Sequence, residues 1–145
     1  MKVVIQRVAN AECIIDGNEV GKTGFGYLLL VGFKEGDQFN TLSKMVKKIA
    51  NLRIFEDENG KMNLNLYEVK GTILSISQFT LYANLSKGNR PSFTDSMEPV
   101  QAKIMYHQFN DLLRQAGFVV SEGVFGAHMD ISLTNCGPVT IIIEL

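Results

Sequence analysis

The chain has 145 residues, of which 46% are hydrophobic and 20% are charged, and its formal net charge at pH 7 is −1. This composition is typical of a compact soluble protein and excludes the disordered and fibrous classes. The length predicts a single domain over residues 1–145, and the balanced charge excludes a global attraction to nucleic acid or membranes, so any RNA contact has to be local.

The N-terminal half is predicted to begin with a β-meander. Strand-like apolar patterns cover residues 3–8, 11–15 and 27–33, with a turn at 16–18. From residue 39 to 51, apolar side chains recur at three- and four-residue spacing, which predicts an amphipathic helix with Asp37 as its cap. The acidic stretch 56–60 follows, and its Asn-Gly pair is typical of a tight hairpin.

The C-terminal half is predicted to hold a buried strand, a loop, a second helix and two more strands. Residues 71–83 are too apolar for a half-exposed strand, which favours burial on both faces. A polar loop covers 84–93, a second helix begins near Pro99 and stops at Gly117, and strands are expected over 129–133 and 139–145. The predicted fold class is therefore α/β, a layered mixed sheet with two main helices packed on one face.

Cysteine usage and hydropathy indicate the compartment. Cys13 and Cys136 are too few for a disulfide framework and match no zinc-binding spacing, so no metal site is predicted. The longest apolar run, residues 27–31, is much shorter than the roughly 20 residues that cross a bilayer. The strand pattern starts without the apolar segment of a signal peptide. We therefore expect a cytoplasmic protein without membrane contacts.

Two short segments stand out because each lies within an apolar, strand-like run. They are SQFTLYA, from Ser77 to Ala83, and NCGPVT, from Asn135 to Thr140. Proline cannot donate a ladder hydrogen bond and glycine frees the backbone, so Gly137-Pro138 indicates a special backbone feature. It is either a hairpin turn or a cis peptide bond that exposes two carbonyl groups. We expect both segments at strand ends on one rim of the sheet.

The hydroxyl groups of Ser77 and Thr80 have two possible roles. They either satisfy local backbone groups or act as nucleophiles. A nucleophile needs an activating base, and neither of the chain's two histidines has the spacing of a catalytic triad. A strand end can instead aim backbone N–H groups, such as those of Gln78 and Phe79, at an oxyanion. The pattern favours an electrostatic site over a serine hydrolase of the usual kind.

Along essentially its whole length the chain resembles the D-aminoacyl-tRNA deacylase family. The resemblance is carried by five blocks in order, which are LRIFED (52–57), SQFTLYA (77–83), RPSFTD (90–95), FGAHM (125–129) and NCGPVT (135–140). It implies an enzyme that hydrolyses the ester bond of D-aminoacyl-tRNA, with glycyl-tRNA, such as glycine mischarged on tRNA-Ala, as a second substrate. It also implies a homodimer that binds aminoacyl-tRNA and needs neither metal nor cofactor.

The resemblance also implies the roles of residues. The Gly137-Pro138 bond would be cis, and the pair would enter the active site of the partner subunit. There its carbonyl groups would hold the α-ammonium group and leave no room for an L side chain. The tRNA's terminal 2′-hydroxyl would assist hydrolysis, although a nucleophilic hydroxyl stays open. The residues that would position the ester and stabilise its oxyanion are Ser77, Gln78, Phe79 and Thr80.

Five further residues complete the expected site. Phe125 and Met129 are expected to line the pocket. Arg7 matches a family arginine and either braces the Gly137-Pro138 carbonyl groups or is an ordinary surface or salt-bridged arginine. Lys87 and Arg90 are candidates for tRNA phosphate contacts, and the lysines at 44, 47 and 48 are weaker ones, because charged helix faces are usually only solvated.

One position departs from the family pattern, and two other functions stay open. Cys136 occupies the variable position of N-x-G-P-V-T, where an acidic or polar residue is more usual, and its thiol is a potential site of oxidation. A related deacylase with a trans Gly-Pro bond acts on an L-aminoacyl-tRNA, but that group lacks the SQFTL form. The other alternative is a noncatalytic RNA-binding module.

Overall fold

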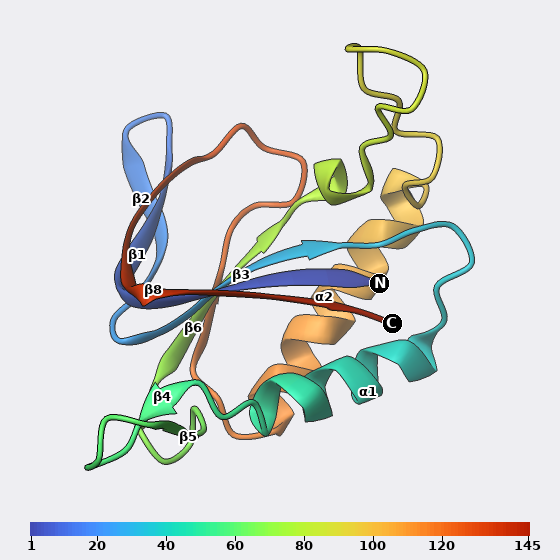
Figure 1. Ribbon diagram of the computed structural model, residues 1–145. Helices are drawn as coiled ribbons and strands as arrows, with labels where there is room; N and C mark the ends of the chain where they lie inside the picture. Colours follow the sequence, from blue (N-terminus) through green and yellow to red (C-terminus); the bar gives the residue numbers. More distant parts are fainter.

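The computed structural model describes residues 1–145, which form a six-stranded mixed sheet, a small two-stranded hairpin and two long helices (Figure 1). In chain order the elements are β1 (Lys2–Ile15), β2 (Asn18–Thr23), β3 (Gly26–Gly32), α1 (Phe39–Ala50), β4 (Phe55–Glu56), β5 (Met62–Leu64), β6 (Thr72–Ser77), the 3₁₀ turn η1 (Phe79–Tyr82), α2 (Pro99–Gln115), β7 (Val120–Glu122) and β8 (Asp130–Glu144). The predicted α/β class is confirmed.

Strand β1 organises the large sheet. Its first half pairs antiparallel with β3, its second half pairs antiparallel with β2, and β8 runs antiparallel along nearly its whole length. Strands β6 and β7 extend the sheet beyond β3 by parallel pairing. Because β3 and β6 are parallel and Val31 lies opposite Ser77, both strands end at the same edge of the sheet.

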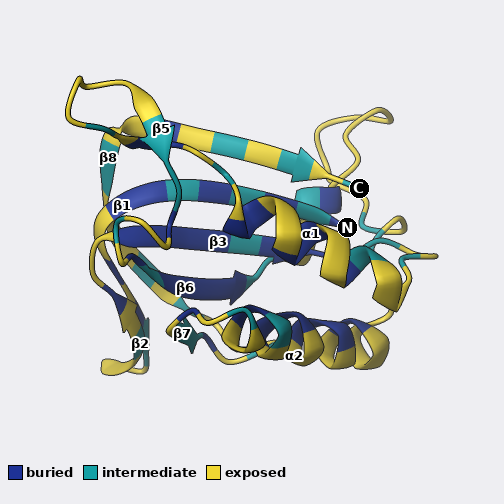
Figure 2. Ribbon diagram, turned by 90° about the horizontal axis from the view of Figure 1, so that it is seen from below, coloured by how far each residue is buried: buried dark blue, intermediate teal, exposed yellow.

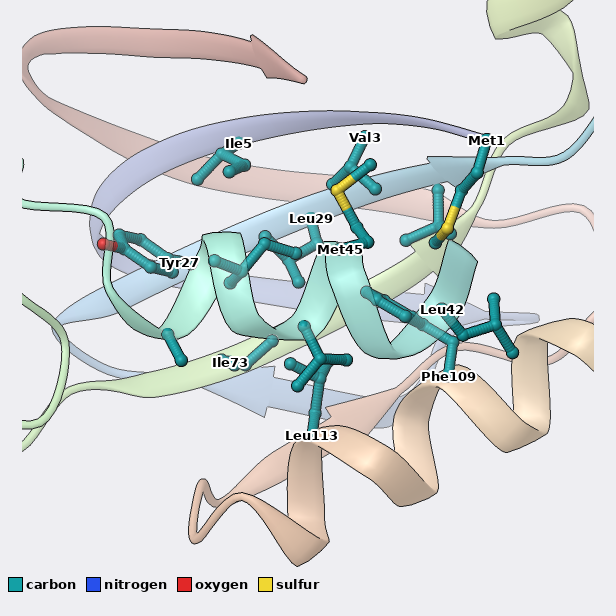
Figure 3. Close-up of a cluster of buried hydrophobic side chains, with 14 of the residues drawn as sticks. Met1, Val3, Ile5, Tyr27, Leu29, Leu42, Met45, Ile73, Phe109 and Leu113 are labelled. Carbon is teal, nitrogen blue, oxygen red and sulfur yellow. The ribbon is translucent and has the colours of Figure 1, made fainter. Parts of the chain in front are cut away.

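The main core lies between the sheet and the two helices. In Figure 3, side chains from β1, β3 and β6 point toward Leu42 and Met45 of α1 and Phe109 and Leu113 of α2. Figure 2 shows the same division along α2, whose buried side faces the sheet while its other side is exposed. Burying each such side chain contributes about 1.5–3 kcal/mol, so the apolar stripes of the helices hold this layer in place.

A second, smaller core covers the opposite face of the sheet. Its six buried residues come from β1, β3 and β6, and they are Val8, Ala11, Cys13, Leu28, Leu74 and Ile76. Strands β3 and β6 are therefore buried on both faces. This confirms the prediction that the apolar run beginning at residue 71 contains a doubly buried strand.

Several expected element boundaries differ from the structure. Strand β1 is one strand with a bulge near residue 9, instead of two strands. Strand β6 ends at Ser77, so the run 71–83 is not a single strand. Asp37 does not cap α1, because its carboxylate accepts hydrogen bonds from the Met1 ammonium group (2.6 Å) and from the Lys34 N–H (2.9 Å). Gln38 takes the cap position instead, without a side-chain hydrogen bond.

The second helix begins and ends close to the predicted residues. Pro99 lies in its first turn, and the Glu98 carboxylate accepts hydrogen bonds from the N–H groups of Val100 and Gln101. This side-chain cap satisfies donors that a helix start leaves free. Neither long helix has the length and hydropathy needed to span a membrane.

Candidate active site

A pocket of about 570 Å³ opens where β3 and β6 end. Four segments form its walls: residues 31–33, residues 76–79, positions between Phe93 and Ala102, and residues 125–129 together with Ile131. Eleven of the 18 lining residues are hydrophobic, so the pocket wall is mainly apolar and carries a few polar groups. That combination is typical of a site that binds a small group and orients it with a few hydrogen bonds.

The pocket brings together part of the predicted site. Ser77, Gln78, Phe79, Phe125 and Met129 all line it. Thr80 does not line the pocket, but its hydroxyl accepts a hydrogen bond from the side-chain amide of Gln78. The other predicted residues that do not line it are Arg7, Lys87, Arg90, Gly137 and Pro138.

The backbone beside the pocket changes direction at the end of β6. The Gln78 N–H donates to the Val31 carbonyl (2.7 Å), which is the last link between β6 and β3. The chain then turns, because the N–H groups of Leu81 and Ala83 donate to the carbonyls of Gln78 and Thr80. The N–H groups of Phe79 and Thr80 donate to no other group in the chain. The free backbone donors therefore belong to Phe79 and Thr80, and the expectation that Gln78 supplies one is wrong.

The loop before α2 holds this turn in place, which the sequence did not indicate. The Ser96 hydroxyl donates to the Phe79 carbonyl (3.2 Å). The Phe93 ring contacts the Phe79 ring edge to face, with 4.9 Å between centroids. Phe93 and Ser96 both line the pocket. The only sequence signal for them was their place in or next to the RPSFTD block.

Strand β6 is also held in place by a hydrogen bond from helix α2. The buried Tyr106 hydroxyl of α2 donates to the Ser75 carbonyl (2.7 Å), two residues before Ser77. Burial raises the pKa of Tyr106 to about 12, so the hydroxyl keeps its proton and stays a donor at neutral pH. The Tyr106 ring lies 6.0 Å from that of Phe125, centroid to centroid. One side chain thus links β6 with the segment on the other side of the pocket.

The Gly137-Pro138 segment forms a bulge within β8. Gln6 pairs with Thr140 and Val8 with Asn135, so four residues of β8, 136–139, lie opposite the single residue Arg7. The structure contains no cis peptide bond, and the predicted cis Gly137-Pro138 bond is therefore wrong. Gly137 instead has a φ of +112°, which lets the backbone accommodate the extra residues while both bonds stay trans. The hairpin-turn alternative is wrong as well, because β8 continues on both sides.

The bulge and the pocket do not share a rim. The pocket lies at Val31 of β3, whereas Arg7 beneath the bulge pairs with Tyr27, near the start of that strand. Four strand residues separate the two positions, which is about 13 Å along the sheet. The expectation that the two segments share one rim of the same chain is therefore wrong. Both Gly137 and Pro138 are exposed.

Arg7 ties the bulge to the neighbouring hairpin. Its side chain is buried, and its Nε donates to the Cys136 carbonyl (3.2 Å), just before Gly137. Its Nη1 donates to the Ile54 carbonyl (2.7 Å), and its Nη2 lies 3.4 Å from the Glu56 carboxylate. A guanidinium group offers five donors in a fixed plane, which suits such a bridge. Arg7 thus contacts the carbonyl next to the Gly137-Pro138 pair.

The charged residues near the pocket are exposed. His128 is the only titratable residue that lines it, and its side chain is 97% exposed with Nε2 4.0 Å from the Asp130 carboxylate. Lys87 and Arg90 lie in the loop between Asn84 and Ser92, are exposed and form no ion pair within the chain. The pocket itself is therefore an apolar site whose polar groups come mainly from backbone, hydroxyl and amide.

Comparison with known proteins gives a consistent match. A family model described as D-Tyr-tRNA(Tyr) deacylase matches residues 4–144. The chain is 54% identical to a D-aminoacyl-tRNA deacylase of Lactobacillus acidophilus and 50% identical to one of Deinococcus radiodurans, with all of both chains covered in each case. Among solved structures it resembles a c-Myc DNA unwinding element binding protein, with a TM-score of 0.94 and 39% identity over 100% of this chain and 99% of the other.

Proposed function

Because the chain belongs to the D-Tyr-tRNA(Tyr) deacylase family, we propose that its pocket holds the aminoacyl end of a D-aminoacyl-tRNA while the ester bond is hydrolysed. The observation that carries this proposal is the pair of free N–H groups, on Phe79 and Thr80, at the turn beside the pocket. Charged tRNA as the substrate places the reaction in the cytoplasm.

The free N–H groups suit the charge that forms during ester hydrolysis. Attack of water on the ester carbonyl carbon places negative charge on the carbonyl oxygen, and fixed donors lower the energy of that state. Donors held by the hydrogen bonds of η1 and of Ser96 need little rearrangement when the charge develops. Loss of one such donor typically costs about 100- to 1000-fold in rate. Ser77 and Gln78 orient the ester, and Thr80 is positioned by its bond to Gln78.

We assign the proton transfers of the reaction to groups of the substrate and not to a side chain of the pocket. The pocket-lining residues include one titratable side chain, the exposed His128. We propose that the 2′-hydroxyl of the terminal ribose orients the attacking water, and that the departing 3′-oxygen receives the proton that the water loses. A D-Tyr-tRNA ending in 2′-deoxyadenosine should then be hydrolysed at least 100-fold more slowly. Hydrolysis of that substrate at the normal rate would refute this role.

The selection of handedness is assigned to a second copy of the chain. Gly137 and Pro138 are exposed and lie far from the pocket of their own chain. Strand β8 pairs only with β1, which leaves its outer edge unpaired over 15 residues, and Ile142 on it is 65% exposed. Long unpaired edges favour pairing with another chain. We propose a homodimer in which the bulge of one subunit enters the pocket of the other.

In that arrangement the bulge excludes substrates by shape. The backbone carbonyls of Gly137 and Pro138 accept hydrogen bonds from the α-ammonium group and occupy the space where an L side chain would extend. Arg7 donates to this backbone at the Cys136 carbonyl, and the Ile54 carbonyl accepts from Arg7 and so helps to fix the guanidinium group. Glycine has no side chain to exclude, so glycyl-tRNA, including tRNA-Ala mischarged with glycine, is a further expected substrate. Phe125 and Met129 contact the amino-acid side chain from the pocket wall.

A comparison of three substrates tests the proposal. Initial rates of deacylation are measured for D-Tyr-tRNA, L-Tyr-tRNA and glycyl-tRNA under identical conditions. We expect rapid release from the D-tyrosyl and glycyl esters and at least 100-fold slower release from the L-tyrosyl ester. A protein that hydrolyses neither the D-tyrosyl nor the glycyl ester would contradict the proposal.

A second candidate is a deacylase for L-aminoacyl-tRNA. The observation that favours it is the trans geometry of Gly137-Pro138. Against it stand the SQFTL form of the first segment and the match to the D-specific family. The same three substrates distinguish the two, because preferred release of an L ester supports the second candidate. Binding of tRNA without any hydrolysis would instead support a noncatalytic module.

A further inference from the structure

Helix α2 carries a row of polar side chains on the side that faces β7. Tyr106, Asn110 and Arg114 recur every four residues, so they lie on one face of the helix. Asn110 is fully buried, and its Nδ2 donates to one oxygen of the Glu122 carboxylate in β7 (2.6 Å). Nη2 of Arg114 donates to the other oxygen of the same carboxylate (2.8 Å). Glu122 therefore joins the helix to the edge strand of the sheet beside it (Figure 2).

Stability alone does not account for this cluster. Oδ1 of Asn110 and Oγ of Ser75 on the facing strand β6 are buried, and neither takes part in a hydrogen bond within the chain. A buried polar atom without a partner costs stability, and apolar side chains of similar shape often pack as well or better. A hydrogen bond to a charged group, in contrast, fixes one particular geometry between the elements that it joins.

The contact lies directly before the segment that forms one wall of the pocket. Glu122 is followed by Gly123, whose N–H donates to the Ser75 carbonyl (3.0 Å). Gly123 packs so closely on the wall that an added Cβ would lie 2.6 Å from Sδ of Met129. Phe125 and Met129 both line the pocket. A shift of Glu122 would therefore be passed to the two side chains that are expected to contact the amino acid.

We propose that Asn110 and Glu122 are positioning residues that determine how well the pocket receives the side chain of a D-amino acid. We call their contact the α2–β7 clamp. The inference rests on the proposed function, which places that side chain against Phe125 and Met129. The free N–H donors belong to the turn η1, which Ser96 holds and the clamp does not touch. The clamp therefore acts on the fit of the side chain and leaves the chemistry at the ester largely unchanged.

Two substitutions that open the clamp test this role. Asn110→Leu removes the donor, and Glu122→Ala removes the acceptor. The glycyl ester has no side chain to fit against the wall, so kcat/KM for glycyl-tRNA should stay within about 3-fold of wild type. For D-Tyr-tRNA, kcat/KM should fall by about 10-fold in each variant, because a displaced wall fits the side chain poorly. Equal losses for both esters would show that the contact only supports the fold and would overturn the clamp.

A double variant tests whether the two residues act together. Asn110→Leu combined with Glu122→Ala should lose no more activity on D-Tyr-tRNA than the worse single variant, because both changes break one contact. Losses that multiply would show that the residues act independently and would contradict a shared clamp.

Asp111→Ala is the matched control. Asp111 is the other carboxylate that pairs with Arg114 (3.0 Å), but its side chain is 63% exposed and forms no hydrogen bond with β7. Its removal takes away the same charge from the same arginine and should leave the ratio of the D-tyrosyl to the glycyl rate unchanged. A change as large as that in Glu122→Ala would assign the effect to Arg114 and overturn the clamp.

The position of the wall can also be measured without substrate. The methyl NMR signal of Met129, identified by its loss in Met129→Leu, should shift in Asn110→Leu and in Glu122→Ala and stay in place in Asp111→Ala. If wild type hydrolyses neither ester, the proposed function fails, and this signal still shows whether the clamp positions the wall. If wild type hydrolyses both esters but the signal or the ratio of rates is unchanged in the clamp variants, only the clamp fails.

Discussion

A single substitution, at Gly137, tests whether the backbone geometry of the β8 bulge matters for stability and selectivity. Its φ of +112° is accessible to glycine and strained for other residues, and an added Cβ would collide with Nη2 of Arg7. Gly137→Ala should therefore lower the free energy of unfolding by about 2–3 kcal/mol and reduce the discrimination between D- and L-Tyr-tRNA. Chemical denaturation and deacylation rates measure the two effects.

Gly60→Ala is the matched control for backbone strain. Gly60 also has a positive φ, of +71°, but an added Cβ would meet nothing within 4 Å. It should cost about 1–2 kcal/mol of stability and leave the discrimination unchanged. Equal effects of both alanine variants on stability and selectivity would show that the contact with Arg7 has no role.

A substitution at His128 tests whether the proton transfers are carried out by the substrate or by this side chain. His128 is the only titratable residue that lines the pocket, yet its side chain is almost fully exposed, and its one ion-pair partner within the chain is Asp130, 4.0 Å from Nε2. A general base contributes about 100- to 10,000-fold. His128→Gln should keep at least a third of the wild-type kcat for D-Tyr-tRNA. A loss of 100-fold would make His128 the base and displace the substrate-assisted scheme.

At the scale of elements, the loop before α2 is expected to control the turn η1. Ser96→Ala removes the hydroxyl that donates to the Phe79 carbonyl and should lower stability by only about 1 kcal/mol. It should nevertheless reduce kcat/KM by about 5- to 10-fold, because the Phe79 and Thr80 N–H groups lose their fixed position. Single-turnover rates measure the effect on the chemical step.

Two further variants show whether the hydroxyl itself matters. Ser96→Thr keeps a hydroxyl and should restore most of the activity. Ser86→Ala, in the same loop, removes a hydroxyl that makes no hydrogen bond within the chain and should have no effect. Full activity of the Ser96→Ala enzyme would argue that η1 is held by its own backbone bonds alone.

The elements also show what sequence patterns could predict here. Apolar spacing located α1, α2 and the doubly buried β6, because helix and strand periods are local properties. It misplaced the free N–H donors by one residue, because the Gln78 N–H is taken up by Val31 of a strand that lies far away in the sequence. The Asp37 cap failed for the same reason, since the competing Met1 ammonium group is a long-range partner. The bulge opposite Arg7 could not be predicted, because it depends on how β8 is aligned with β1, and a local sequence pattern does not contain that pairing register.

At the scale of the whole molecule, the single chain does not place its bulge at its own pocket. The pocket lies at the end of β3 and β6, whereas Gly137 and Pro138 lie opposite Arg7, which pairs near the start of β3. If the bulge completes the site, it has to come from another copy, and the unpaired edge of β8 beside it offers a surface for that copy (Figure 2). Mixing two defective chains distinguishes a shared site from a self-contained one.

The two chains carry defects in different parts of the shared site. Ala127→Trp fills the pocket and leaves the bulge intact, and Pro138→Trp enlarges the exposed bulge and leaves its own pocket intact. Each homodimer should be inactive, because every site combines one pocket with one bulge. Half of the dimers refolded from an equal mixture are mixed, and each has one intact site, so activity should return to about a quarter of wild type. If the bulge served its own chain, the mixture would stay inactive, and if it served no site, Pro138→Trp alone would be active.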